Sequence, residues 1–491
     1  MKLMRVLSAL LALLMLATCL VACKKDGGEE AATTTAAGAA VETQSSLFEE
    51  NGGGRDFVAL TRKVNEGDFT YQYGEMGVVA DETSGRVDQA VYERDLYLNE
   101  TFNVNIVTMP ENRSDMVTAL REVNMSGMAF YDIVMPMTAD TFALGLEGAL
   151  YEFDSIPYVD VTQEHWNLAL YNTTSIGGYN FFAQGSANIS AYNSVGVTYF
   201  NKQLIQDLTL ENPYDLVKNN QWTFEKMKTM CAAATEEVDG VNGMDWHDRY
   251  GLAINNFAWQ PFFYASGNML VEKGEGDIPT LSVITPGSAE IVSEVLGQIS
   301  TFFNDANATI LRQTAKFNAS EVVTTMESDI FMDDRSLFYI ENVYGQILLR
   351  DMKTDYGILP MPKYYDHQDR YYHTVSKDNA SVMFLPVTHS DADLEALGTV
   401  ISAISEYSMH LVTPAYYDVQ LKYRDSRDDE SGEMLDLIFA SRTFDIADAY
   451  NWGGIIGQYT QLDMNMASRF ESVITAAKMQ IQEMIDDMEL E

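Results

Sequence analysis

Strand and helix patterns alternate along the first third of the chain, and this alternation constrains the fold more than any other feature. A strand-like segment at 69–73 is followed by a helical face over 87–102, a strand at 104–107, a helix over 114–123 and a strand at 131–135. Strands that alternate with helices in this way predict a parallel sheet with helices on its faces. Further strands are expected at 180–183, 195–202, 250–254, 336–340 and 381–386, so the fold class is α/β.

Length and charge set outer limits on what the chain is. Its 491 residues, of which 46% are hydrophobic, exceed what one ordinary core holds, so two or more lobes are expected. The formal net charge of −41 repels nucleic acid and anionic lipid, and it fits a ligand that is neutral or cationic. The stronger interpretation is that this acidity mainly keeps the protein soluble and away from the membrane surface.

The N-terminus has the pattern of an export signal. Lys2 and Arg5 precede an apolar run from Val6 to Ala22, which ends at Cys23. Val21-Ala22-Cys23 resembles a bacterial lipobox, which implies cleavage before Cys23 and lipidation of its thiol. Residues 1–22 are then a lipoprotein signal peptide, and the Ala-, Thr- and Gly-rich residues 23–55 are a flexible tether. The alternative is an uncleaved membrane helix, for which the run is slightly short.

This N-terminus also determines where the protein should reside and which cysteines remain. Either interpretation places the globular part outside the cytoplasm, and lipidation would anchor it to the cell membrane. Of the three cysteines, Cys19 leaves with the signal and Cys23 carries the lipid, so no intrachain disulfide is available. Cys231 shares a helical stripe with Phe224, Met227 and Ala234, which predicts a buried structural thiol.

Several stretches, taken in order, resemble family 1 of the extracellular solute-binding proteins, which serve ABC importers and are associated with carbohydrates. They are the lipobox with its tether, residues 195–202 (VGVTYFNK), 221–227 (QWTFEKM), 356–363 (YGILPMPK) and the segment from 380 to 396. The resemblance covers nearly the whole mature chain. Its weight comes from the order and spacing of the stretches, because no single one is specific.

The resemblance implies a two-lobed fold of the type II periplasmic-binding-protein kind, with crossing strands as a hinge and ligand in the cleft between the lobes. Lobe 1 would comprise residues 56–192 and 377–491, with parts of 415–465 packing on either lobe, and lobe 2 residues 193–376. The ligand would favour the closed state, which an ABC permease would recognise. A monomer without a cofactor is expected.

Candidate ligand-binding residues follow from the rule that ligands of open α/β sheets bind beyond the carboxyl ends of strands. Aromatic rings suit the C–H faces of sugars, and carboxylates and amides suit their hydroxyl groups. An aromatic in these positions can equally belong to the core, and a carboxylate can be a helix cap or solvated. The candidates are Glu75, Asp140, Trp259, Gln260, Tyr264, Asn342, Tyr344, Tyr450, Asn451 and Trp452.

Three functions remain open at this point. The favoured one is capture of an oligosaccharide for an ABC importer, and the second keeps the fold but binds peptides or a small cationic solute. The third is a surface glycan hydrolase, for which a carboxylate pair carries no information among 72 acidic residues. The sequence has no H-E-x-x-H, G-x-S-x-G or phosphate-loop motif, so no catalytic residue, cofactor or metal ligand is predicted.

Overall fold

The computed structural model describes residues 54–65, 70–140, 144–145, 147–238, 240, 243–245, 247–305, 309–311, 327–422, 429–454 and 466–488. The predicted signal peptide, the predicted lipidation site Cys23 and nearly all of the predicted tether lie outside these residues. Within them, no helix is both long enough and apolar enough to cross a membrane.

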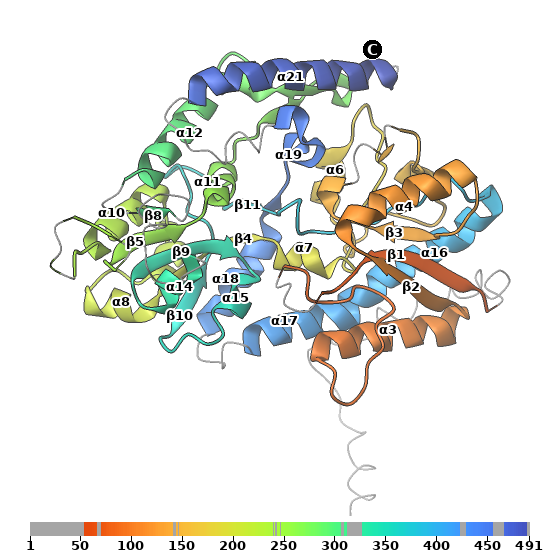
Figure 1. The fold of residues 1–491 in the computed structure, drawn as a ribbon, viewed down its shortest axis with the longest axis horizontal. Coiled ribbons are helices and arrows are strands. Elements are labelled where there is room, and N and C mark those ends of the chain that lie inside the picture. The colour runs from red at the N-terminus through yellow and green to blue at the C-terminus, as the bar shows by residue number, and fades with distance from the viewer. Residues whose placement is uncertain are drawn as a thin grey trace, which may run out of the picture. The chain divides into compact units, whose positions relative to one another are not determined.

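The first sheet has the predicted parallel architecture. Strand β1 (Asp56–Arg62) lies between β2 (Asn105–Glu111) and β3 (Ile133–Met135), and both pairings are parallel. Helices α3 (Arg86–Phe102) and α4 (Arg113–Ser126) connect these strands (Figure 1). The strand predicted at 69–73 is wrong, because residues 70–73 form no strand. Tyr71 is nevertheless buried, and its hydroxyl group donates a hydrogen bond to the carboxylate of Glu75.

Returning chain from the second half of the sequence completes the first sheet. Phe384 and Met383 form antiparallel bridges with Val134 and Ala183, respectively. Helix α16 (Asp391–Tyr407) follows and packs its apolar face on this sheet. The helix begins with a capping box, in which the Asp393 carboxylate accepts a 3.4 Å hydrogen bond from the Ser390 backbone amide.

The second sheet has five strands in the order β10-β4-β9-β5-β8. Strands β5 (Tyr250–Ile254), β9 (Ser336–Asn342) and β8 (Thr309–Leu311) run parallel, while β4 (Gly196–Asn201) runs antiparallel to β9 and to β10 (Tyr356–Leu359). Strands β4 and β5 are buried along their whole length, which requires cover on both faces. Helices α10 (Phe224–Ala234), α11 (Trp259–Ala265), α12 (Ser288–Phe303) and α14 (Glu327–Met332) surround the sheet.

Cys231 confirms the prediction of a buried structural thiol. It lies on α10 in the core of the second sheet, together with Phe224, Met227 and Ala234. Burial raises the pKa of the Cys231 thiol well above its usual value. Gly251 of β5 passes so closely that a Cβ atom there would lie 2.3 Å from the Cα atom of Cys231. This close approach explains the glycine.

Three connections join the two sheets. Val195 and Val375 pair as an antiparallel bridge where the first two connections cross, and the Ser376 amide donates a 2.9 Å hydrogen bond to the Ser194 carbonyl group. The third connection runs from α16 through a π-helical segment (Ser408–Val412) into α17 (Thr413–Lys422). Helices α18 (Asp429–Ala440) and α21 (Met466–Asp487) add side chains to the core of the second sheet.

The remaining elements are short. They are α6 (Leu168–Thr174), α7 (Ile189–Asn193), α8 (Lys202–Asp207), α9 (Pro213–Lys218), β6 (Val271–Lys273), β7 (Pro279–Leu281), α15 (Gly345–Leu348), β11 (His373–Thr374), β12 (Arg442–Thr443) and α19 (Ile446–Tyr450), with 3₁₀ turns such as Thr138–Asp140, Phe153–Ser155, Asn256–Ala258, Glu275–Asp277, Ser282–Ile284 and Trp452–Gly454.

Candidate functional site

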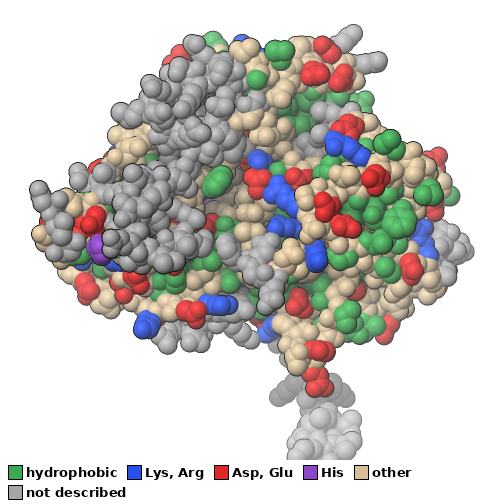
Figure 2. Space-filling view, in the orientation of Figure 1, with side chains coloured by type: hydrophobic (Ala, Val, Ile, Leu, Met, Phe, Trp, Pro, Cys, Tyr) green, Lys and Arg blue, Asp and Glu red, His purple; other side chains and the backbone are tan. Residues whose placement is uncertain are grey.

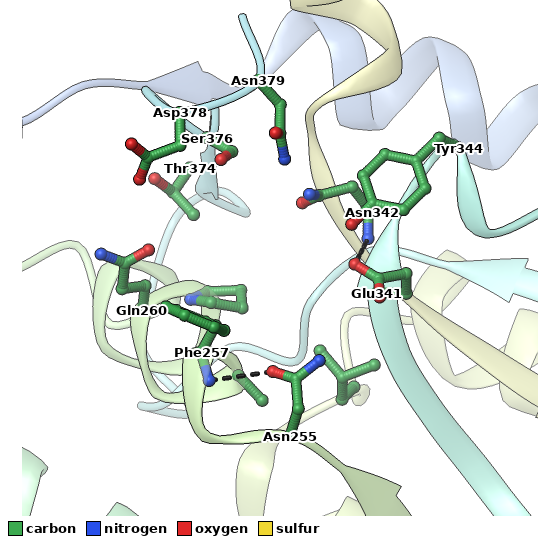
Figure 3. A pocket seen from close by; sticks show the side chains of 13 residues that line it. Asn255, Phe257, Gln260, Glu341, Asn342, Tyr344, Thr374, Ser376, Asp378 and Asn379 are labelled. Atoms are coloured by element: carbon green, nitrogen blue, oxygen red, sulfur yellow. Dashed lines mark hydrogen bonds between the residues drawn. The ribbon is translucent and has the colours of Figure 1, made fainter. Parts of the chain in front are cut away.

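A cavity of about 300 Å³ opens where β5 and β9 end. Because these two strands are parallel, their carboxyl ends lie at the same edge of the sheet. Residues after β5 form one wall, the end of β9 forms another, and the segment after β11 forms the third (Figure 3). The lining residues are Asn255, Phe257, Ala258, Gln260, Pro261, Ile340, Glu341, Asn342, Tyr344, Thr374, Ser376, Asp378 and Asn379.

The wall after β5 is held by Asn255. Its side-chain oxygen accepts a 2.9 Å hydrogen bond from the Phe257 amide, and its side-chain nitrogen donates to Glu327. This arrangement starts the turn into α11 and leaves the ring of Phe257 59% exposed. Gln260 lies one turn further on, and its amide group is 3.5 Å from Asp448. The wall therefore presents an aromatic ring and amide groups to the cavity.

The wall at the end of β9 contains a carboxylate. Glu341 accepts hydrogen bonds from the Asn342 amide (2.9 Å) and from the Tyr339 hydroxyl group (3.3 Å). Burial, together with the neighbouring carboxylate of Glu327, raises the pKa of Glu341 to about 7. Asn342 and Tyr344 complete this wall, so acidic, amide and phenolic groups converge here.

The third wall is fixed by ion pairs. Arg113 of α4 lies 3.0 Å from a carboxylate oxygen of Asp378, and Lys377 lies 2.9 Å from the other. Burial alone would raise the pKa of Asp378, but these two cations hold it below its usual value. Arg113 also pairs with Asp140 at 2.8 Å. Asp140 thus does not line the cavity, and instead holds the arginine that positions Asp378.

A second, much smaller cavity of about 10 Å³ shares Thr374 with the first. Two buried carboxylates, Asp445 and Asp448, belong to its lining. Asp445 accepts hydrogen bonds from the backbone amides of Ala447 (2.8 Å) and Leu270. Burial raises the pKa of Asp445 to about 6 and that of Asp448 to about 8. This space holds about one water molecule, so it is no ligand site of its own.

Three of the ten sequence-predicted residues line the main cavity: Gln260, Asn342 and Tyr344. Trp259 and Tyr264 also lie on α11, but they face the core and are 0% and 1% exposed. The first turn of a helix has one face toward the core and one toward the surface, and these two rings lie on the face toward the core.

The remaining predicted residues lie elsewhere. The Tyr450 ring stacks on Trp452 with centroids 5.0 Å apart, and Trp452 is buried at 3% exposure instead of offering an open platform. Asn451 between them ends α19 in the left-handed conformation, with φ 51°. Glu75 is buried in a polar network on the first-sheet side.

Some lining residues were not predicted from the sequence, although their position at the end of a strand indicates them. Asn255 directly follows β5 and Glu341 lies at the end of β9, so the strand-end rule points to both. Phe257 follows two residues later. Thr374, Ser376, Asp378 and Asn379 carry no local signal, because only the crossing of the two connections brings them to the cavity.

Comparison with known proteins identifies the fold of this chain. No protein-family model matches the sequence, and no curated protein matches it either. Solved structures do match. The cyclic α-maltosyl-1,6-maltose binding protein from Arthrobacter globiformis has a TM-score of 0.57 at 12% identity, and the match covers 87% of this chain and 99% of that one.

Two further solved structures are similar to this chain over comparable lengths. A cyclo/maltodextrin-binding protein complexed with maltotetraose has a TM-score of 0.55 at 11% identity, with 88% of this chain and 97% of that one covered. The maltose/maltodextrin-binding domain MalE from Bdellovibrio bacteriovorus, bound to maltotriose, has a TM-score of 0.52 at 13% identity, with 87% and 100% covered. The chain therefore has the α/β fold of the type II periplasmic-binding proteins, which confirms the predicted fold class.

Proposed function

We propose that this protein is a solute-binding protein of an ABC importer, and that it captures an oligosaccharide in the cavity at the ends of β5 and β9. The observation that carries the proposal is the position of this cavity. It lies at the carboxyl edge of the second sheet and is closed by residues 374–379, which connect that sheet to the first. The similar solved structures are named as binding maltotriose and maltotetraose, which supports a saccharide as ligand.

The chemistry of the lining supports the same class of ligand. Four amide side chains and two aliphatic hydroxyl groups offer donors and acceptors to sugar hydroxyl groups, and Phe257 and Tyr344 offer rings to C–H faces. The volume lies at the lower end of small-molecule sites, which span roughly 300–1,000 Å³. The amides are Asn255, Gln260, Asn342 and Asn379, and the hydroxyl groups are those of Thr374 and Ser376.

Binding is favoured over hydrolysis. The similar solved structures are named as binding proteins and not as hydrolases. Both Glu341 and Asp378 line the cavity, but Asp378 is engaged by Arg113 and Lys377, so its carboxylate serves to fix the wall.

Export and anchoring complete the proposal. The basic start, the apolar run from Val6 and Cys23 support a lipoprotein held at the outer side of the cell membrane. The proposed lobes are residues 56–192 with 377–491, where parts of 415–465 pack on either lobe, and residues 193–376; α21, whose side chains join the core of the second sheet, departs from this division. The strands of the first sheet fall in the first set and those of the second sheet in the other. The partner is an ABC permease, and the protein acts as a monomer.

A thermal-shift screen tests this function. The mature chain, residues 23–491 with Cys23→Ser to prevent lipidation, is heated with oligosaccharides of several classes and, separately, with a peptide mixture. A ligand that binds only the folded state raises the melting temperature by mass action. A shift with one oligosaccharide class supports the proposal. A shift with peptides alone contradicts it and favours the second function.

A further inference from the structure

One carboxylate of the cavity, that of Glu341, has a negative charge that no described lining residue neutralises. Glu341 lines the cavity and is partly buried, and Figure 3 shows its carboxylate beside Asn342. Its hydrogen-bond donors include the Asn342 amide and the hydroxyl groups of Tyr339 and Tyr344, all of them uncharged. No Lys, Arg or His occurs among the described lining residues, and within the described chain Glu341 takes part in no ion pair.

The groups that face Glu341 do not supply a cation either. Glu327 of α14, a second carboxylate, acts on it electrostatically, and the Tyr339 and Tyr344 hydroxyl groups lie close to it. From α15, Gly345 packs against its side chain next to Tyr199. The other lining carboxylate, Asp378, differs because Arg113 and Lys377 neutralise it. The negative potential of the cavity is therefore concentrated on the β9 wall.

Two aromatic rings and the surface charge favour a positive group at this place. Phe257 and Tyr344 both line the cavity, and the faces of such rings attract cations. Figure 2 shows acidic side chains at many points of the described surface on its visible face. With a net charge of −41, the whole molecule attracts cationic solutes.

We infer that the ligand of this cavity is an amine-bearing saccharide, whose ammonium group contacts the Glu341 carboxylate while its hydroxyl groups meet the amides of the other walls. This inference rests on the proposed function and narrows its substrate class. A buried carboxylate without a cation is costly, and an ammonium group would supply the missing partner. A neutral sugar would leave that cost in place.

The titration of Glu341 supports the assignment. With a pKa near 7, part of the population is protonated at neutral pH. Contact with a cation favours the ionised form, so binding releases a proton from Glu341. Affinity for an amine that stays charged should then increase as the pH rises from 6 to 7.5, whereas affinity for a neutral sugar should not.

Calorimetry with matched ligands tests the inference. The mature chain, residues 23–491 with Cys23→Ser, is titrated at pH 6.5 with glucosamine oligosaccharides and with their N-acetylated counterparts. Acetylation replaces each basic amine with a neutral amide. We expect the amine-bearing series to bind at least tenfold more tightly. Glu341→Gln should remove this preference, so that the two series bind with similar affinity. Glu433→Gln, which removes an equal charge from the exposed face of α18, should change neither.

The possible outcomes distinguish a failure of the amine-bearing ligand class from a failure of the proposed saccharide binding. Equal or tighter binding of the acetylated series overturns the amine-bearing class but keeps the saccharide-binding proposal. Failure of both series, and of every other oligosaccharide, overturns both. The comparison of the two series uses the unmutated cavity, so it decides the question even if Glu341→Gln does not fold.

Discussion

Ser381 donates a 2.8 Å hydrogen bond to the carboxylate of Glu75, although 306 positions separate the two residues in the chain. The backbone amide and the hydroxyl group of Ser190 donate to the same carboxylate, at 3.0 and 2.8 Å. Ser190 lies shortly before the first crossing at Val195, and Ser381 lies shortly after the second at Val375. Glu75 therefore ties together the ends of two connections between the sheets.

The third connection meets the same place. Arg94, which is 0% exposed, donates a 2.9 Å hydrogen bond to the Glu75 carbonyl group and a 2.8 Å hydrogen bond to the Ser408 hydroxyl group. Ser408 begins the π-helical segment between α16 and α17. Two connections thus bond the Glu75 carboxylate directly, and the third reaches the Glu75 backbone through Arg94, which gives Glu75 a structural role.

Removing the Glu75 carboxylate should destabilise the protein. Glu75→Ala leaves the buried donors of Ser190 and Ser381 without their acceptor, and each such donor costs about 1–3 kcal/mol. We expect the free energy of unfolding to fall by about 3 kcal/mol, as measured by urea denaturation. Glu75→Gln, which keeps one acceptor oxygen, should cost less. Glu82→Ala, at an exposed position, serves as control, and equal losses for Glu75→Ala and Glu82→Ala would contradict the role of the network.

The stability should decline with rising pH above neutrality. Burial raises the pKa of Asp448 to about 8, above its value in the unfolded chain. A carboxyl group with a raised folded-state pKa contributes stability below its unfolded pKa, and this contribution is lost as the pH rises through 8. The buried histidines His165 and His373, whose pKa values burial lowers to about 4 and 3, are already neutral there.

Melting temperatures between pH 7 and 9 measure this decline. Asp448→Asn cannot ionise, so it should flatten the curve and raise the melting temperature at pH 9. Asp436→Asn, an exposed position on α18, provides the control. A curve for Asp448→Asn that falls as steeply as that of the parent would show that Asp448 does not titrate in this range.

Arg113 should control the third wall of the cavity from outside it. Arg113→Ala releases Asp378 from its ion pair and from the 2.9 Å hydrogen bond that Arg113 donates to the Asp378 carbonyl group. We expect at least a tenfold loss of ligand affinity by calorimetry with little change in folding. Arg121→Ala removes an exposed ion pair with Glu147 from the same helix and should leave affinity unchanged. Equal effects of the two changes would argue against the positioning role.

Cys23 should decide where the protein resides in the cell. Cys23→Ser removes the thiol that the proposed lipid occupies, so the protein should move from the membrane fraction to the soluble fraction. Cell fractionation followed by mass spectrometry of the N-terminal peptide checks both the location and the lipid. Retention of Cys23→Ser in the membrane fraction would instead favour the uncleaved N-terminal helix.

Local patterns in the sequence predict the fold class because α/β architecture is encoded by alternating strand and helix periodicities. The same patterns lead to Gln260, Asn342 and Tyr344, which line the cavity, since each lies at or shortly after the carboxyl end of a parallel strand. They do not reveal that the rings of Trp259 and Trp452 are buried, because a short helix or loop does not show which side chains face the core. They do not lead to Asp378, because its position depends on the pairing of Val195 with Val375, 180 positions apart in the chain.

The most direct test of the account is a calorimetric titration of the mature chain and its Asn342→Ala variant with oligosaccharides that shift the melting temperature. Asn342 lines the cavity, and loss of its amide should lower affinity about tenfold, which corresponds to about 1.4 kcal/mol. Gln203→Ala removes an exposed amide on α8 and should bind as the parent does. One-to-one binding that Asn342→Ala weakens and Gln203→Ala does not would support a saccharide site at the ends of β5 and β9. Oligosaccharide binding that both variants retain in full would contradict it.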